Sequence, residues 1–275
     1  MAGTLYIVGT PIGNLGDISF RAIDALKNAD IIACEDTRHT KILLDRYSIK
    51  TATTSYHKFN IRSKTRHIMD QLKTGRNVAL VSDAGMPGIS DPGQELIGDA
   101  AVSGIRIEVI PGPSAAISAL SLSGFGSGRF AFEGFLPVKP SQRKGRLQAL
   151  TKEQRTIIIY EAPHRLARTL EALIGSLGDR RVCVARELTK KFEEVSRGRI
   201  SEMIDKFAGV RPKGEFVIVI EGKGESSFVK TSEDRLVGLV DDLAKAGFQK
   251  SEAVKIVAKR MNIPKNTLYR DTLGN

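Results

Sequence analysis

The chain has 275 residues, of which 41% are hydrophobic, and a formal net charge of +11. This length favours two or three domains, and the apolar content is enough to give each a core, which argues against disorder. No run approaches the roughly 18 apolar residues of a membrane span, and the start MAGTLYIVGT lacks the basic region and cleavage site of a signal peptide. We therefore expect a cytoplasmic protein that does not use a membrane.

Apolar, β-rich runs alternate with helical patterns over residues 1–125, which we expect to form the first domain. The runs are TLYIVG, DIIACE, TATTSY, NVALVS and IRIEVI. Helical patterns lie near residues 18–28, 37–47, 61–74 and 94–103, and another begins at PSAAISAL. Such alternation predicts an α/β domain with a mostly parallel sheet covered on both faces. Ligands of these sheets bind beyond the carboxyl ends of the strands.

The stretch from Gly126 to Gly145 interrupts this rhythm with glycine, proline and a basic cluster, so a domain boundary is expected near residues 124–130. A second α/β domain over residues 126–226 contains the expected strands FAFEGF, RTIIIYEA, RRVCVARE and GEFVIVIEG. Helices are expected near residues 142–150, 164–177 and 200–207. Residues 227–275 read as three short helices only, a pattern that fits a helix-turn-helix-like module and equally a plain helical cap.

Most of the positive charge lies in the middle of the chain. Residues 137–214 hold 18 Lys and Arg against 9 Asp and Glu, whereas the segments on either side are nearly neutral. A local excess of this size indicates a polyanionic partner, most simply RNA or DNA. Cys34 and Cys183 lie far apart within apolar runs, and no two histidines have metal-ligand spacing, so no metal is expected.

Four loops follow expected strand ends in the first domain: GTPIGN, CEDTRHT, VSDAGMPGISDPG and PGPSAA. Glycine lets a ligand approach the backbone, and proline keeps the loop stiff. The third loop has twelve consecutive residues of turn chemistry from Ser82 to Gly93, against about two to six in an ordinary connection between strand and helix. It therefore indicates a binding loop, not merely a cap for the next helix. A Rossmann-type nucleotide is a weaker alternative, because the glycine fingerprint is incomplete although Glu35 and Asp36 end the second strand.

The motifs VGTPIGNLGDIS, EDTRHTKILL, SDAGMPGISDPG, IPGPSAAISAL, GFLP, YEAPHRL, RELTKKFEE and GEFVIVIEG occur in this order. Together they resemble the ribosomal RNA small subunit methyltransferase I family of the tetrapyrrole methylase superfamily, from about Leu5 to Gly222. The resemblance implies two α/β domains with a cofactor cleft between them and a small C-terminal helical module. It also implies a homodimer that uses S-adenosylmethionine to methylate the 2′-hydroxyl of one cytidine in the decoding region of 16S ribosomal RNA.

The resemblance also implies site residues. Family members often have threonine where this chain has Met86, and because the neighbouring residues match we expect the same cofactor. The implied cofactor contacts are Thr10, Pro11, Asp83, Ala84, Gly85, Met86, Pro87, Ile89, Ser114, Ala115, Tyr160, Glu161, Ala185 and Arg186. Cations near the loops or in the basic segment are candidate RNA contacts: Arg38, Arg143, Lys144, Arg165 and Lys191.

The sequence does not identify a general base. Asp36, Glu187 and Lys190 are the hypotheses, the lysine only if burial lowers its pKa. Asp36 has a second interpretation as the cap of the following helix, and the run RELTKK can be a solvated strand end. Two other functions remain open: a methyltransferase acting on a tetrapyrrole or another small molecule, and a noncatalytic RNA-binding protein that assists ribosome assembly.

Overall fold

The computed structural model describes residues 2–209, 212–223 and 232–261. Residues 1–123 and 127–223 form one compact unit, and residues 224–275 with 124–126 form another. Within the described part of the chain, no helix is long and apolar enough to cross a membrane. The expected division at residues 125 and 226 remains a prediction.

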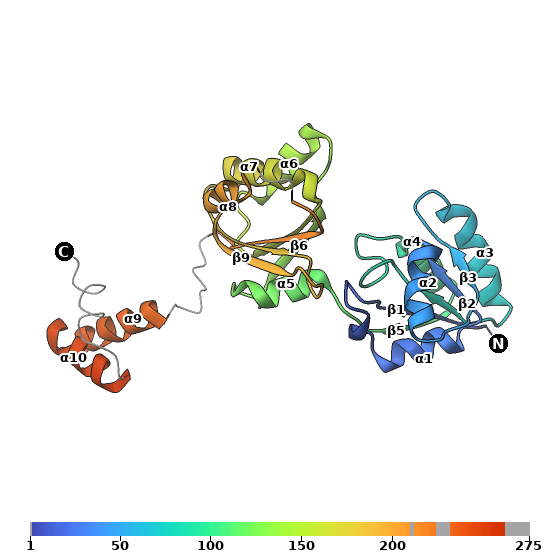
Figure 1. Cartoon of the computed structure of the whole chain (residues 1–275), viewed down its shortest axis with the longest axis horizontal. Helices are drawn as coiled ribbons and strands as arrows, with labels where there is room; N and C mark the ends of the chain where they lie inside the picture. The colour runs from blue at the N-terminus through green and yellow to red at the C-terminus, as the bar shows by residue number, and fades with distance from the viewer. Residues whose placement is uncertain (1, 210–211, 224–231, 262–275) are drawn as a thin grey trace. The chain divides into compact units, whose positions relative to one another are not determined.

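The first sheet is built from residues 4–110 and is entirely parallel. Its strands are β1 (Thr4–Val8), β2 (Ile31–Cys34), β3 (Thr53–Ser55), β4 (Val78–Leu80) and β5 (Arg106–Ile110). They lie in the order β3-β2-β4-β1-β5 (Figure 1). Because all strands point the same way, the four glycine- and proline-rich loops meet at one edge of the sheet, as expected from the sequence.

Two separate apolar cores cover the two faces of this sheet. Helices α1 (Phe20–Asn28) and α2 (Thr37–Arg46) pack on one face, and α3 (Ile61–Lys73) and α4 (Gln94–Val102) pack on the other. The helical periodicity sets this arrangement, since Leu26 of α1 and Leu72 of α3 are fully buried whereas the outer faces are polar. A short 3-10 helix, η1 (Leu15–Asp17), follows the first loop.

The second sheet is mixed. Its strands are β6 (Phe130–Phe135), β7 (Thr156–Glu161), β8 (Arg181–Arg186), β9 (Glu194–Arg199) and β10 (Phe216–Ile220), in the order β6-β7-β10-β8-β9. Only β6 and β7 are parallel. The sequence did not predict β9, because EVSRGR is an edge strand with one buried residue, Ser196, and therefore has no apolar run to reveal it.

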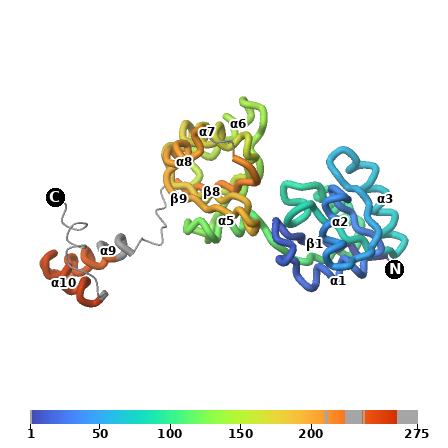
Figure 2. The backbone as a smooth tube through the Cα atoms, in the orientation of Figure 1, coloured from blue at the N-terminus to red at the C-terminus, as the bar shows by residue number. Residues whose placement is uncertain are grey.

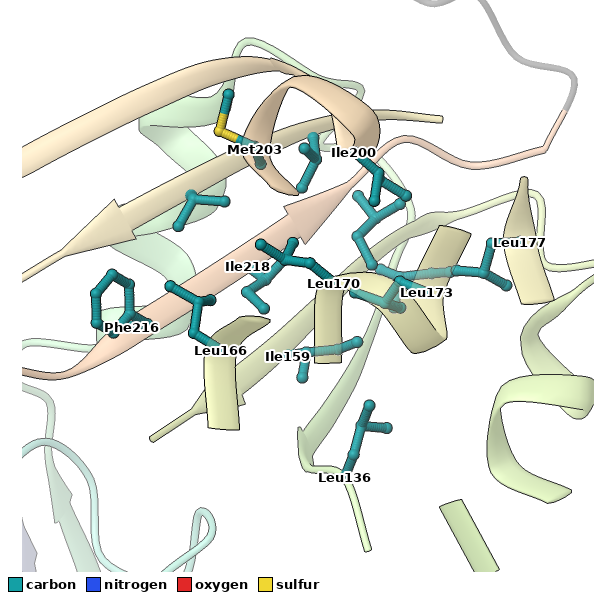
Figure 3. Packing of buried hydrophobic residues seen from close by; sticks show 14 of the residues in the cluster. Leu136, Ile159, Leu166, Leu170, Leu173, Leu177, Ile200, Met203, Phe216 and Ile218 are labelled. Carbon is teal, nitrogen blue, oxygen red and sulfur yellow. The ribbon is translucent and has the colours of Figure 1, made fainter. Parts of the chain in front are cut away.

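Helices α6 (Pro140–Leu150), α7 (Leu166–Leu177) and α8 (Ile200–Phe207) cover one face of the second sheet, and the 3-10 helix η2 (Pro163–Arg165) leads into α7. Figure 3 shows the core between them, where Leu170 and Leu173 of α7 lie beside Ile218 of β10. These side chains are fully buried.

Helix α5 (Ala115–Ser123) covers the other face of the second sheet, although it precedes the boundary expected near residue 125. It contacts β7, β8 and β10, and Figure 2 traces the backbone from the first sheet into it. The residues AAISALSLS are apolar or small all around the helix, so their pattern does not say which sheet they cover.

The C-terminal part contains α9 (Ser232–Lys245) and α10 (Lys250–Met261) (Figure 1). The two helices pack through Val240, Val254 and Val257. These match two of the three helices expected there. The third, PKNTLYRDTL, lies outside the described residues.

Candidate functional site

The long loop after β4 is bonded directly to the loop after β1. The Thr10 amide donates to the Gly85 carbonyl at 2.9 Å, and the Gly85 amide donates back to the Thr10 carbonyl at 3.1 Å. Gly85 has a φ of +80°, a conformation that glycine adopts without steric cost. The Asp83 carboxylate accepts a bond from the Asp36 amide at 3.0 Å, which ties in the loop after β2. Three loops from distant parts of the sequence thus form one rigid assembly.

Glycine is also required where the first and fourth loops touch. A Cβ atom added to Gly9 would lie 2.7 Å from the Gly112 backbone and 2.7 Å from the Met86 sulfur. Real Cβ atoms do not approach other atoms this closely. The contact between Gly9 and Gly112 therefore sets the spacing of the loops around the site.

A cavity of about 420 Å³ lies between these loops and the carboxyl end of β7. This volume falls within the roughly 300–1,000 Å³ of small-molecule sites. Most of the expected cofactor contacts line it: Asp83, Ala84, Gly85, Met86, Ile89, Ser114, Ala115, Tyr160 and Glu161. The structure thus brings together residues that lie up to 78 positions apart, from Asp83 to Glu161.

The remaining expected cofactor contacts lie elsewhere. Thr10 and Pro11 line an adjoining cavity of about 570 Å³, which shares Asp83 and Ala84 with the first. Three others line neither cavity: Pro87, which is buried in its loop; Ala185, which is buried within β8; and Arg186, which donates to the Lys213 carbonyl at 2.7 Å. These three positions remain predictions from the family resemblance.

One wall of the cavity is aromatic and apolar. It includes Phe135, Tyr160, Phe216 and Val217. The rings of Phe135 and Tyr160 meet edge to face with centroids 5.6 Å apart. The Tyr160 hydroxyl accepts a hydrogen bond from the Ala116 amide at 3.2 Å, which fixes the ring at the start of α5, and burial raises the pKa of this phenol. Such a wall can hold a planar base.

The lining of the cavity is also acidic. Glu35, Asp83, Asp91 and Glu215 all contribute to the cavity lining. Burial, followed by the charges of Glu35 and Asp83, raises the pKa of Asp91 to about 6. Burial and Asp83 also raise the pKa of Glu35. An acidic wall of this kind favours a ligand with positive charge.

Sequence reasoning missed Asp91 and Glu215. Asp91 belongs to the long loop after β4, but the sequence Ser-Asp-Pro-Gly around it is typical of an ordinary turn. Glu215 belongs to the motif GEFVIVIEG, but nothing in this motif marks its side chain as part of a site. Glu35 was a candidate only through its position at the end of the second strand.

The three candidate bases are all engaged in ion pairs. The Lys190 ammonium donates to Glu187 at 2.9 Å and to Glu215 at 2.8 Å. Burial lowers the pKa of Lys190, but the bonds to the two carboxylates outweigh it and the net pKa is raised. Lys190 therefore lacks the lowered pKa that it would need to act as a base. Burial raises the pKa of Glu187, but the bonds from Lys190 and the Glu215 amide produce a net decrease.

Asp36 caps helix α2, in agreement with its second interpretation. Its side chain accepts from the Arg38 amide at 2.8 Å and from the Arg38 guanidinium at 2.8 Å. These bonds hold the pKa of Asp36 far below its usual range. A carboxylate this weakly basic is a poor proton acceptor at neutral pH.

The candidate RNA contacts differ in their exposure to solvent and in their ion pairs. Lys144 on α6 and Lys191 after β8 are exposed, Arg143 is half-buried, and Arg38 is paired with Asp36. Arg165 lies 3.1 Å from Glu161, whose side chain is fully buried, and it also donates to the Leu136 carbonyl at 2.7 Å. Its guanidinium is therefore occupied within the fold.

This fold and site define a class of proteins. Residues 4–204 match the family model of the Tetrapyrrole (Corrin/Porphyrin) Methylases. The structure is similar to uroporphyrin-III-C-methyltransferase from Thermus thermophilus, with a TM-score of 0.58 and 21% identity over 79% of this chain and 94% of that one. It is also similar to diphthine synthase, with a TM-score of 0.61 and 16% identity over 80% and 90% of the two chains. The expected two-sheet fold is thereby confirmed.

Closer relatives identify the family within this class. The chain is 46% identical to ribosomal RNA small subunit methyltransferase I of Synechocystis, over 98% of both sequences. It is 46% identical to the protein of that name from Bacillus subtilis, over 97% of this chain and 93% of that one. The chain belongs to the ribosomal RNA small subunit methyltransferase I family, as its motifs predicted.

Proposed function

We propose that this protein transfers a methyl group from S-adenosylmethionine to the ribose 2′-hydroxyl of a cytidine in the decoding region of 16S ribosomal RNA. Family membership supports the reaction class and the RNA substrate. The structural observation that carries the proposal is the cavity of about 420 Å³, which combines glycine-rich loops, an acidic wall and an aromatic wall.

The residues around the cavity fit this cofactor. S-adenosylmethionine has a cationic ammonium and sulfonium, a carboxylate and a planar adenine. Asp83 and Glu35 would face the positive groups, and Tyr160 and Phe135 would border the base. Backbone groups of the loop after β4, other than those of Gly85 that bind Thr10, would bind the polar tail. A related uroporphyrin-III C-methyltransferase from Thermus thermophilus has been solved in complex with S-adenyl homocysteine.

The bound cofactor supplies an activated methyl group, so the protein mainly has to align the reacting atoms and exclude water. The assembly of three loops fixes one side of the cavity before RNA arrives. Lys190 is paired with both Glu187 and Glu215, so exposed cations elsewhere are the better candidates for phosphate contacts. The exposed Lys144 and Lys191 would add contacts that do not depend on sequence.

We further propose that the protein acts as a homodimer in the cytoplasm, where ribosomes are assembled. The family resemblance supports both statements. A sedimentation measurement of the purified protein distinguishes a dimer from a monomer.

The proposal is tested by mapping 2′-O-methyl groups on 16S ribosomal RNA from cells with and without this gene. We expect one cytidine in the decoding region to lose its methyl group without the gene and to regain it with the wild-type gene. Complementation with Asp83→Asn should restore little methylation. Asp99→Asn, an exposed position on α4, is the matched control and should restore it fully. If the methylation pattern stays the same without the gene, the proposal is wrong.

A further inference from the structure

We propose that Asp91 accepts the proton from the ribose 2′-hydroxyl during methyl transfer. This inference rests on the proposed function and assigns a role that the family motifs leave open. It follows from the position of Asp91 in the cavity, the backbone that holds it there and the groups that surround it.

Asp91 lies where the long loop of the first sheet meets the second sheet. It lines the same cavity as Asp83 and Tyr160. The preceding Ser90 has a φ of +67°, which is strained for a residue with a side chain. A Cβ atom on Gly134 of β6 would lie 3.0 Å from the Ser90 hydroxyl oxygen, so the two pack closely. Ser90, the neighbour of Asp91, thus packs against β6 of the second sheet.

Helix capping does not explain Asp91. Helix α4 starts at Gln94, its N-cap is Gly93, and no side chain caps it. In the part of the chain that the structure describes, no cation pairs with the Asp91 carboxylate. An aspartate in this position that served stability alone would be expected to bond the helix end or a basic group.

The groups facing Asp91 come from four segments, and their combined effect favours proton uptake. Glu35 at the end of β2, Asp83 in the same loop and Glu215 before β10 are acidic, and the Tyr160 phenol faces it from β7. A hydrogen bond with Ser82 only partly offsets burial and these charges. Lys58 and His57 lower the pKa of Glu35, and the Lys190 ammonium pairs with Glu215 at 2.8 Å.

The resulting pKa of about 6 suits a general base, since Asp91 is mostly ionised at neutral pH yet still basic. Asp36 and Glu187, by contrast, have lowered pKa values. In the proposed step, the 2′-hydroxyl proton moves to an Asp91 carboxylate oxygen as the hydroxyl oxygen forms a bond to the methyl carbon. The carbon–sulfur bond breaks, its electron pair stays on sulfur, and the protonated Asp91 later releases its proton to water.

The test compares Asp91→Asn with Glu35→Gln, a neighbouring acid in the same cavity, and with Asp99→Asn outside it. Single-turnover methylation is measured from pH 5 to 8 with saturating S-adenosylmethionine and small-subunit RNA. For the wild type, the rate should fall tenfold per pH unit below the Asp91 pKa. Asp91→Asn should lower the rate at pH 7.5 by about 10²–10⁴-fold and abolish this pH dependence. Asp99→Asn should retain the pH dependence. Glu35→Gln should keep the decrease in rate at low pH but shift it to lower pH, because the Glu35 charge raises the pKa of Asp91.

Two further readouts do not depend on turnover. Calorimetry should show that Asp91→Asn binds S-adenosylmethionine within about threefold of wild type, which also demonstrates that the variant is folded. Carboxyl ¹³C NMR of the cofactor-free protein, with the resonance assigned by its absence in the variant, should show Asp91 titrating near pH 6.

Several results would overturn the inference while leaving the proposed function intact. One is a methylation rate for Asp91→Asn within a few fold of the wild-type rate. Another is that Asp91→Asn keeps the decrease in rate at low pH. A third is that Glu35→Gln, and not Asp91→Asn, loses this decrease. If Asp91→Asn no longer binds the cofactor, Asp91 is a cofactor ligand and not the base. If NMR shows Asp91 titrating below pH 4.5, its carboxylate is too weakly basic for the proposed step. If wild-type protein methylates no RNA, the proposed function itself fails.

Discussion

Arg165 illustrates how a single cation in the basic segment can be used inside the fold. Its side chain is 16% exposed and lies 3.1 Å from the Glu161 carboxylate, which is fully buried. Glu161 also accepts from the Thr169 hydroxyl at 2.6 Å and from the Ala162 amide at 2.9 Å. Arg165 thus places its charge against a buried acid next to the cavity, and its contact with RNA stays a prediction.

We therefore predict that Arg165→Ala lowers the free energy of unfolding by about 3 kcal/mol, because it leaves Glu161 buried without its counter-ion. Arg168→Ala removes an exposed cation from the adjoining helix α7 and should change the free energy of unfolding by no more than about 0.5 kcal/mol. Urea unfolding at pH 7 measures both. Equal unfolding midpoints for the two variants would show that the ion pair contributes nothing to stability. A defect in RNA binding without a loss of stability would show that Arg165 contacts RNA.

At the scale of elements, the site depends on loops that touch backbone to backbone. The first and third loops exchange two hydrogen bonds through Thr10 and Gly85, and the first and fourth meet at Gly9 and Gly112. Each parallel strand delivers its loop to the same edge, and glycine removes the side chains that would keep the loops apart. The elements therefore set the shape of the cavity as much as the lining residues do.

This arrangement predicts that Gly9→Ala weakens S-adenosylmethionine binding by at least tenfold and destabilises the protein by about 1–3 kcal/mol through overpacking. Gly98→Ala is the matched control, because nothing lies within 4 Å of its new methyl group in α4. There the change should stabilise the protein by about 0.5–1 kcal/mol through helix propensity. Calorimetry and thermal unfolding measure these effects. Unchanged cofactor affinity in Gly9→Ala would disprove the role of the close contact.

At the scale of the whole molecule, the excess of basic residues and the acidic residues of the cavity lie in different parts of the chain. Residues 137–214 hold twice as many Lys and Arg as Asp and Glu, 18 against 9, whereas the cavity contains the carboxylates of Glu35 and Asp83. A basic surface attracts RNA over a long range, and an acidic cavity selects a cationic cofactor. The two preferences do not compete, since they act at different places.

RNA affinity should accordingly fall steeply with salt, and the slope should report the phosphate contacts. Replacing Arg143 and Lys144 with alanine is predicted to reduce the slope of log affinity against log salt by about 0.7 for each lost contact with single-stranded RNA. Lys27→Ala with Lys50→Ala removes the same charge from exposed positions on the first domain and should leave the slope unchanged. Filter binding between low and physiological salt measures this. If both pairs have the same effect, α6 does not contact RNA.

The sequence by itself determined the strand–helix alternation, the parallel first sheet and the family, and it predicts that the long loop binds a ligand. These features are local: apolar periodicity and runs of glycine and proline act over a few residues and need no knowledge of distant contacts. For the same reason the sequence missed β9, whose EVSRGR pattern buries only Ser196 at the sheet edge.

Only the tertiary structure decided which candidates are free to act. It placed α5 on the second sheet, paired Lys190 with Glu187 and Glu215, and gathered Glu35 and Asp91 around one cavity. Proton affinity depends on burial and on charges brought close by folding, which sequence distance does not encode. The motif therefore identified the loop, whereas the packing around it singled out Asp91.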